Sequence, residues 1–398
     1  MALWIASDLG VHEKRCIVQA GVGLSEVPRN EDWRAVRRMS LFQNKIVEIS
    51  SCPICPELTT LFLQENKLEN ISGKFFTSMP KLVVLDLSWN RALDRLPEEI
   101  SRLVSLRYLD LSRTEIAQLP IGLQKLKKLA HLNLEFMMRL ESISGISHLS
   151  SLRTLKLKDS KMSLDTSTMQ DLKLLEYLEV LTLDITSSLV MEQLLQDSRL
   201  VRCIKDISMA KLPEESFKML TLPSMVSLRN LIIQSCGMLE IKIEEMIINT
   251  CFFPNLSKVY IQQCNGLKDL TWLLFASNLT HLEVGFSREL EDIISKEKAT
   301  SVTGTIAPFQ KLEHIKLLDL PMLKNIFKSP LPFPKLKYVY VRNSPKLKKL
   351  PLDSNSVDSV KALVIYYCEQ EWSDGIEWED EATRCRFDPS FKPWYITR

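Results

Sequence analysis

The sequence predicts an α/β solenoid, in which short parallel strands stack side by side and each strand is followed by a return segment. Three observations lead to this fold class: a repeated phrase, a regular spacing of apolar residues, and a small polar residue at one fixed place in most copies. The phrase LVVLDLSWN at 82–90 returns as LRYLDLSRT at 106–114. Repetition at a period of about twenty to fifty residues is typical of stacked repeat architectures.

Apolar residues occupy three fixed positions in fourteen consecutive copies of the unit. We number each copy from its first apolar residue, the anchor, and the positions three and five residues further on are apolar in every copy. The anchors are Val36, Leu58, Leu82, Leu106, Leu129, Leu152, Leu178, Ile204, Leu228, Leu256, Leu279, Leu312, Leu336 and Val360. Their mean spacing of about 25 residues lies in the range of leucine-rich repeats.

The alternation of apolar and other residues within each unit has the period of a strand with one buried face. One such strand cannot cover its own apolar face, so the strands are expected to form a parallel sheet on the concave side of a horseshoe-shaped leucine-rich-repeat solenoid. The return segments, of about a dozen residues or more, are expected to cross the convex side as short helices and irregular turns.

A small polar or thiol side chain stands at anchor plus eight in most units, where the chain turns inward. A buried turn leaves backbone groups without water, and a short side chain can satisfy them. These residues are Asn44, Asn66, Asn90, Thr114, Ser160, Thr186, Cys236, Cys264, Ser287, Ser344 and Cys368.

Composition excludes several classes of function. The formal net charge of +2 gives no reason to expect nucleic acid as a partner. The longest apolar runs are far too short for a transmembrane segment, and MALWIAS at the start lacks the basic residues of a secretory signal. We therefore expect a cytoplasmic protein.

No constellation of catalytic, cofactor-binding or metal-ligating residues is recognisable. Three of the five histidines, His131, His281 and His314, share the position anchor plus two, which points to the concave surface. The motif CPIC at 52–55 has no second pair of ligands nearby, so a zinc site is not expected. The phosphate-binding loop of nucleotide-binding proteins is also missing, and the chain is not expected to be an enzyme.

The candidate site residues lie at the outward positions of the concave strands, which carry information that the scaffold does not dictate. Aspartates at neighbouring outward positions repel each other, so stability alone does not explain them. We therefore expect Asp86 and Asp110 to contact a cationic partner. Near the other end, tyrosines and an arginine form an aromatic and cationic region of the kind that anchors interfaces. The predicted partner-binding residues are Asp86, Tyr108, Asp110, His131, Asn133 and Lys156, and then Tyr260, Tyr338, Tyr340 and Arg342.

The chain is expected to have three parts: an N-terminal flank at 1–35, the repeats at 36–368, and a C-terminal acidic and aromatic cap at 369–398. The segment 368–382 is acidic, and the repeat before it is rich in lysine. We therefore expect the tail to fold against this basic end, with Trp372 and Trp378 covering the last strand.

The amino-acid sequence of the repeats resembles that of a known family. LVVLDLSWNRALDRLPEEISRLVSLRYLDLSRTEIAQLPIGLQKLKKLAHLNLE at 82–135, NGLKDLTWLLFASNLTHLEV at 265–284 and EWEDEATRCRF at 377–387 are similar to the leucine-rich-repeat region of plant disease-resistance proteins of the coiled-coil, nucleotide-binding type. MALWIASDLG at 1–10 looks like the end of the winged-helix subdomain that precedes the repeats in that family.

The resemblance implies a non-enzymatic module that senses a pathogen effector or a guarded host protein and that also rests on the receptor's own nucleotide-binding domain in autoinhibition. ADP or ATP is expected only for that domain, which this chain lacks. The family also implies a cytoplasmic location, in some members at the inner face of the plasma membrane.

The leading alternative from another class is a leucine-rich-repeat substrate adaptor for ubiquitin ligation. It requires a helical segment before the repeats, and only about thirty-five residues precede Val36. An extracellular receptor domain is a further alternative, which the missing signal and cap cysteines oppose.

Overall fold

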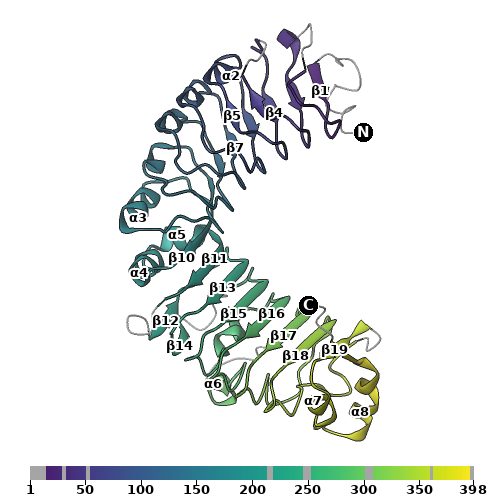
Figure 1. Cartoon of the computed structure of the whole chain (residues 1–398). Helices are drawn as coiled ribbons and strands as arrows, with labels where there is room; N and C mark the ends of the chain where they lie inside the picture. The colour runs from purple at the N-terminus through teal and green to yellow at the C-terminus, as the bar shows by residue number, and fades with distance from the viewer. Residues whose placement is uncertain are drawn as a thin grey trace. The chain divides into compact units, whose positions relative to one another are not determined.

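The computed structural model describes residues 15–28, 33–50, 54–212, 218–244, 252–300, 308–358 and 362–394 of the chain. The chain divides into two compact units, Met1–Asp184 and Ile185–Arg398. Each unit is a stack of parallel strands with short helices in the return segments (Figure 1). The predicted leucine-rich-repeat architecture is confirmed in both units.

Each repeat of the first unit contributes one strand to its main sheet. Its main sheet contains, in order, β1 (Cys16–Val18), β2 (Arg38–Ser40), β4 (Thr60–Phe62), β6 (Val84–Asp86), β7 (Tyr108–Asp110), β8 (His131–Asn133), β9 (Thr154–Lys156) and β10 (Val180–Ile185). A second small sheet pairs β3 (Glu48–Ile49) with β5 (Asn70–Ile71). The helices are η2 (Trp33–Ala35), α2 (Gly73–Thr77), η3 (Glu98–Arg102), η4 (Ile121–Lys125), η5 (Ile146–His148) and α3 (Thr166–Lys173).

The second unit has longer strands. Its main sheet contains β11 (Ile204–Ala210), β13 (Asn230–Gln234), β15 (Lys258–Gln262), β16 (His281–Gly285), β17 (His314–Leu318), β18 (Tyr338–Arg342), β19 (Val364–Tyr367) and β20 (Phe391–Pro393). A small sheet pairs β12 (Met219–Leu222) with β14 (Glu240–Ile243). The helices are α4 (Ser188–Leu195), α5 (Ser198–Cys203), η6 (Thr271–Phe275), α6 (Lys296–Thr300), α7 (Gln370–Asp374), α8 (Glu381–Phe387) and η8 (Asp388–Ser390).

The apolar spacing predicts the strand register correctly in the repeats before the last. Residues at anchor plus three lie opposite one another on neighbouring strands, as Leu85 does with Leu109 and Leu109 with Leu132. All side chains at anchor plus three and plus five are at most 3% exposed. These rows of leucine, isoleucine and valine form the continuous apolar core of each unit.

The last repeat departs from the predicted register by two residues. Val339 lies opposite Ile365 rather than Leu363, and Tyr340 lies opposite Tyr366. A shift of two residues leaves the same side chains on the buried face, because strand side chains alternate with period two. The anchor assigned to this repeat, Val360, lies outside the described residues.

The small residues at anchor plus eight act as predicted. The side-chain amide of Asn90 donates to the carbonyl oxygens of Leu63 and Leu87 at 3.0 and 2.8 Å, and its oxygen accepts from the N–H of Leu68 at 3.1 Å. Thr114 and Ser160 each donate a hydroxyl to a buried strand carbonyl, at 2.7 and 2.6 Å. Each of these side chains therefore replaces water at a turn that water cannot reach.

The residue just before this position, anchor plus seven, has a left-handed backbone. Its φ lies between 46° and 62° in twelve repeats, and none of the twelve residues is glycine. They are Gln43, Glu65, Trp89, Arg113, Phe136, Asp159, Lys211, Ser235, Gln263, Phe286, Asp319 and Asn343. Glycine and asparagine usually mark such a turn, and among these twelve residues only Asn343 is of either type, so the sequence does not predict the turn.

Strands also flank the predicted repeats at both ends. In the segment 1–35, β1 pairs with β2, and in the segment 369–398, β20 pairs with β19. The likeness of residues 1–10 to a winged-helix subdomain lies outside the described residues and stays a prediction.

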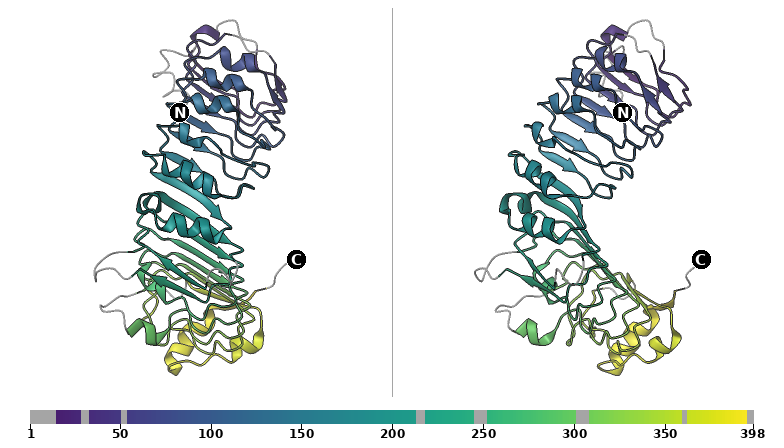
Figure 2. Two further views of the ribbon diagram at one scale, coloured as in Figure 1. Left: turned by 90° about the vertical axis from the view of Figure 1, so that its left-hand side faces the viewer. Right: turned by 60° about the vertical axis from the view of Figure 1, so that its left-hand side comes forward.

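Aromatic side chains attach the C-terminal segment to the second unit, where α7 and α8 gather at one end (Figure 2). The indole N–H of Trp372 donates to the carbonyl of Leu347 at 2.8 Å, and Trp378 stacks on Phe387 with ring centroids 5.9 Å apart. Within the described residues, the ion pairs of this segment stay inside its own helices, as in Arg384 with Asp388. Aromatic packing and hydrogen bonds to the preceding repeats, such as that from the Asn343 N–H to Glu369 at 3.0 Å, attach this end, and no ion pair with the lysines is among the described contacts.

Candidate functional site

The predicted site residues fall into two groups, one in each unit. Asp86, Tyr108, Asp110, His131, Asn133 and Lys156 lie on β6 to β9 of the first unit. Tyr260, Tyr338, Tyr340 and Arg342 lie on β15 and β18 of the second unit. All ten occupy the strand face that is opposite to the apolar core, in agreement with the predicted alternation.

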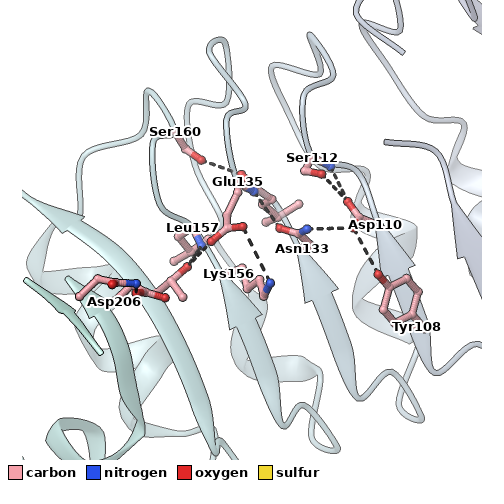
Figure 3. Close-up of polar contacts among 12 residues, drawn as sticks. Tyr108, Asp110, Ser112, Asn133, Glu135, Lys156, Leu157, Ser160 and Asp206 are labelled. Carbon is pink, nitrogen blue, oxygen red and sulfur yellow. Dashed lines mark hydrogen bonds and ion pairs between the residues drawn. The ribbon is translucent and has the colours of Figure 1, made fainter. Parts of the chain in front are cut away.

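Asp110 is the centre of a hydrogen-bond network in the first unit (Figure 3). One carboxylate oxygen accepts from the backbone N–H and the hydroxyl of Ser112, at 2.9 and 2.6 Å. The other accepts from the amide of Asn133 at 2.8 Å and from the hydroxyl of Tyr108 at 3.3 Å. The side chain is only 7% exposed. The neighbouring donors already satisfy this carboxylate, and its contact with a cationic partner stays a prediction.

Asp86 lies directly opposite Asp110 on the neighbouring strand and is half-buried. Its carboxylate accepts from the backbone N–H of Ser88 at 2.9 Å, as Asp110 does from Ser112. The Asp-Leu-Ser phrase of both repeats thus closes the same local turn between side chain and backbone. Burial raises the pKa of Asp86, and the negative charge of Asp110 adds to this rise, while the hydrogen bonds from Ser88 oppose it.

Tyr108 and His131 are the ring-bearing members of this group. Burial raises the pKa of the Tyr108 hydroxyl, and the carboxylates of Asp110 and Asp86 raise it further. Its ring lies 6.1 Å from the ring of His131, which is exposed. In the first group, His131 is therefore the predicted residue most accessible to a partner.

Glu135 is part of the network, although sequence reasoning missed it. Its backbone N–H donates to the side-chain oxygen of Asn133 at 3.1 Å, and its carboxylate accepts from Thr182 at 2.8 Å. The ammonium group of Lys156 lies 3.9 Å from the same carboxylate (Figure 3). Glu135 stands at anchor plus six, and the opposite charge of Lys156 on the next strand could have indicated this pair.

The second unit carries an aromatic platform, which we define as His281, His314, Tyr338, Tyr340, Tyr366 and Trp394. His281 stacks on His314 with centroids 4.3 Å apart, and His314 stacks on Tyr338 at 5.0 Å. Tyr340 stacks on Tyr366 at 4.8 Å and meets Trp394 edge to face at 5.3 Å. All six side chains are half-buried. The structure thus brings two predicted tyrosines together with two histidines that the sequence analysis placed on the concave surface but did not assign to the site.

The two stacked histidines have lowered pKa values. Burial lowers the pKa of His281, and the positive charge that His314 gains on protonation lowers it further. Burial also lowers the pKa of His314. Protonation therefore works against the stack that these rings form.

Tyr260 and Arg342 have surroundings different from those predicted. At anchor plus four, Glu283 and Lys316 separate Tyr260 from Tyr340, and these two charged groups pair at 3.3 Å. The Arg342 guanidinium binds the Asp319 carboxylate, with a distance of 3.0 Å from Nε, and stands 5.5 Å above the ring of Phe286. Arg342 is therefore already paired within its own unit.

An open hollow of about 710 Å³ lies beside this pair, at the turns that end the strands of the second unit. Phe286, Asp319 and Asn343 line it together with the unpaired residue Arg288. Within the described ranges, Arg288 makes no ion pair.

No helix in the same described ranges could cross a membrane.

Comparison with known proteins places this architecture in a family. The leucine-rich-repeat region family matches residues 35–374. The chain is 57% identical over 398 residues to the Arabidopsis thaliana disease resistance protein RPS5, covering 98% of this chain and 45% of that protein. It is 58% identical over 397 residues to the probable disease resistance protein At1g12290 of the same plant, with the same coverage. The chain therefore spans less than half the length of these relatives.

A solved structure supports the fold alone. An LRR protein of Leptospira interrogans aligns with a TM-score of 0.50 and 18% identity, over 94% of each chain. The resemblance to plant disease-resistance proteins is confirmed by the relatives above, and the chain belongs to the leucine-rich-repeat region family.

Proposed function

We propose that the chain is the protein-recognition module of a plant immune receptor and that it senses a pathogen effector or a guarded host protein. The aromatic platform carries this proposal. It gathers tyrosine, tryptophan and histidine rings on one half-exposed strand face, and such rings supply much of the binding energy at protein interfaces. The apolar core does not require these rings, because the inward-facing side chains of the same strands are already buried, as Val339, Val341 and Ile365 are.

The first unit is proposed to act in autoinhibition by resting on the receptor's nucleotide-binding domain. His131 and Lys156 are its exposed or partly exposed candidates, whereas Asp110 is occupied within its own network. The proposed location is the cytoplasm, and ADP or ATP is assigned to the nucleotide-binding domain and not to this chain. No residue constellation in the described ranges supports catalysis, so the proposed role is non-enzymatic.

The test expresses the receptor that contains this chain in leaf tissue, with Tyr340→Ala and Tyr366→Ala combined. We expect pathogen-triggered cell death to be lost while the amount of receptor stays unchanged. Tyr177→Ala is the matched control, because Tyr177 is 58% exposed and lies outside the platform. An unchanged response in the platform variant would refute the proposed recognition surface.

The autoinhibitory role is tested separately, with His131→Ala combined with Lys156→Ala. Neither change removes a donor to Asp110, but Lys156→Ala also removes the ion pair with Glu135, so thermal unfolding of the double variant checks that the fold persists. We expect cell death in the absence of a pathogen. If the double variant stays silent and still responds normally to the pathogen, the first unit does not hold the receptor inactive through these residues.

A further inference from the structure

A second surface lies at the turns that follow the strands of the first unit, one residue beyond Ser112 and Glu135 of the Asp110 network. We define the rim stack as Trp89, Arg113 and Phe136, with Arg91 beside it. The Arg113 guanidinium stands 4.2 Å from the ring centroid of Trp89 and 3.7 Å from that of Phe136. The Arg91 guanidinium stands 5.3 Å from the Trp89 ring. One guanidinium is thus held between two rings, and a second lies against the outer ring.

The repeat fold does not require bulky side chains at these turn positions. Trp89, Arg113 and Phe136 occupy anchor plus seven in three successive repeats, with left-handed φ values of 62°, 59° and 58°. Any side chain in this conformation costs about 1–2 kcal/mol relative to glycine, so the turn has no use for a bulky ring. The same position holds Gln43 in an earlier repeat. Trp89 is also 39% exposed, which leaves much of a large apolar ring in water.

Both guanidiniums lack an anionic partner. Across the described part of the chain, neither Arg91 nor Arg113 makes an ion pair. Another arginine of the same unit does, since Arg139 lies 2.7 Å from the Glu115 carboxylate. Two rings lie against the Arg113 guanidinium, and the N–H groups that they do not contact stay available as donors. Such a fork matches a carboxylate and loses little conformational freedom on binding, since the rings already hold it.

The second unit shows what a stacked guanidinium binds in this protein when a carboxylate is within reach. Arg342 stands over Phe286, which occupies anchor plus seven as Trp89 and Phe136 do, and it donates from Nε to Asp319 at 3.0 Å. The rim stack also places a guanidinium against aromatic rings, there against two rings at shorter distances, but no carboxylate of the described residues pairs with it.

We propose that the rim stack binds a carboxylate-rich segment of a protein partner, with Arg113 as the fork and Trp89 and Phe136 as its supports. Arg91 adds a second cation for a neighbouring carboxylate. This surface shares no residue with the aromatic platform, and the proposal does not depend on the role of the platform in immunity.

The probe is a fluorescent peptide of eight residues with four glutamates, measured by anisotropy against the folded chain, and its glutamine counterpart is the matched peptide. We expect the glutamate peptide to bind at least tenfold more tightly than the glutamine peptide. Arg113→Lys should weaken binding of the glutamate peptide at least tenfold, because lysine keeps the charge but loses the planar fork. Trp89→Ala should weaken it as well, because the fork loses one supporting ring.

Gln43→Ala is the matched control at the same position of another repeat, and it should leave the affinity unchanged. Thermal unfolding of every variant shows that the fold persists. Equal binding of both peptides, or wild-type affinity in Arg113→Lys, would overturn the proposal. An equal loss of binding in the combined Tyr340→Ala and Tyr366→Ala variant would instead place the peptide on the platform, and that result also rejects the rim stack.

Discussion

Asn133 donates its side-chain amide to the carboxylate of Asp110 across two neighbouring strands, at 2.8 Å. This bond links residues that sequence reasoning assigned to a partner. A half-buried strand face therefore contains two kinds of polar residue: those that satisfy one another and those that remain open. The distinction decides which substitutions test stability and which test recognition.

Asp110→Ala tests the structural role of the network. Removing the carboxylate leaves the Ser112 N–H and the Tyr108 hydroxyl without their acceptor in a largely buried place. A buried donor without a partner costs about 1–3 kcal/mol, so we expect the first unit to unfold at a clearly lower temperature or urea concentration. His131→Ala is the exposed control on the next strand, with an expected change within about 0.5 kcal/mol. Equal stability of both variants would show that the network contributes little.

Asp86→Asn tests the raised pKa of this carboxyl. A raised pKa in the folded state means that the folded chain binds more protons than the unfolded chain between the two pKa values. Stability is therefore lost as the pH rises from about 4 through the folded pKa. The asparagine variant keeps the oxygen that accepts from Ser88 and removes this loss, so at pH 7 it should be more stable than the wild type.

The control for this pH experiment is Asp94→Asn, at an exposed aspartate of the same repeat. Denaturant unfolding at pH 7 and again below pH 4 separates the two variants. The advantage of Asp86→Asn should vanish at the lower pH, where the wild-type carboxyl is itself protonated. An advantage that persists there would point to a cause other than ionisation.

Asn90 offers a test of the turn residues at anchor plus eight. Asn90→Ala leaves the Leu87 carbonyl and the Leu68 N–H buried without this partner, while the Leu63 carbonyl still accepts from Asn66, and we expect a loss of about 2 kcal/mol. Asn90→Thr should cost less, because Thr114 shows that a hydroxyl at this position can donate to a strand carbonyl. Equilibrium unfolding of the two variants ranks them, and the reverse order would contradict this account of the turn.

The stacked histidines predict a pH dependence of the second unit. Their lowered pKa values mean that the unfolded chain binds protons more readily, so stability is lost as the pH falls through about 6.5. We expect a lower unfolding temperature at pH 5.5 than at pH 7.5. Replacing both residues, with His281→Gln and His314→Gln, should remove much of this difference. An identical pH profile in the double variant would show that other groups cause it.

The sequence predicts the scaffold better than it predicts the surface. The apolar positions set the register because burial on one face leaves no freedom, as with Leu85 and Leu109. The last repeat could slip by two residues because this slip keeps Ile365 buried. The partners of Asp110 depend on turn geometry and on the next strand, which spacing alone does not reveal. The stacking of His281 on His314 was missed for the same reason, since their shared position shows proximity but not ring orientation.

The final strand of the second unit has a consequence for the protein's behaviour at high concentration. Trp394 donates its backbone N–H to Tyr367, on the side where β20 meets β19. Because N–H groups alternate along a strand, the nitrogen of Pro393 faces the edge of β20 that no described strand covers, where it has no hydrogen to donate. A strand of a second molecule that approached this edge would lack one hydrogen-bond donor, and this disfavours fibre-like growth by edge-to-edge strand pairing.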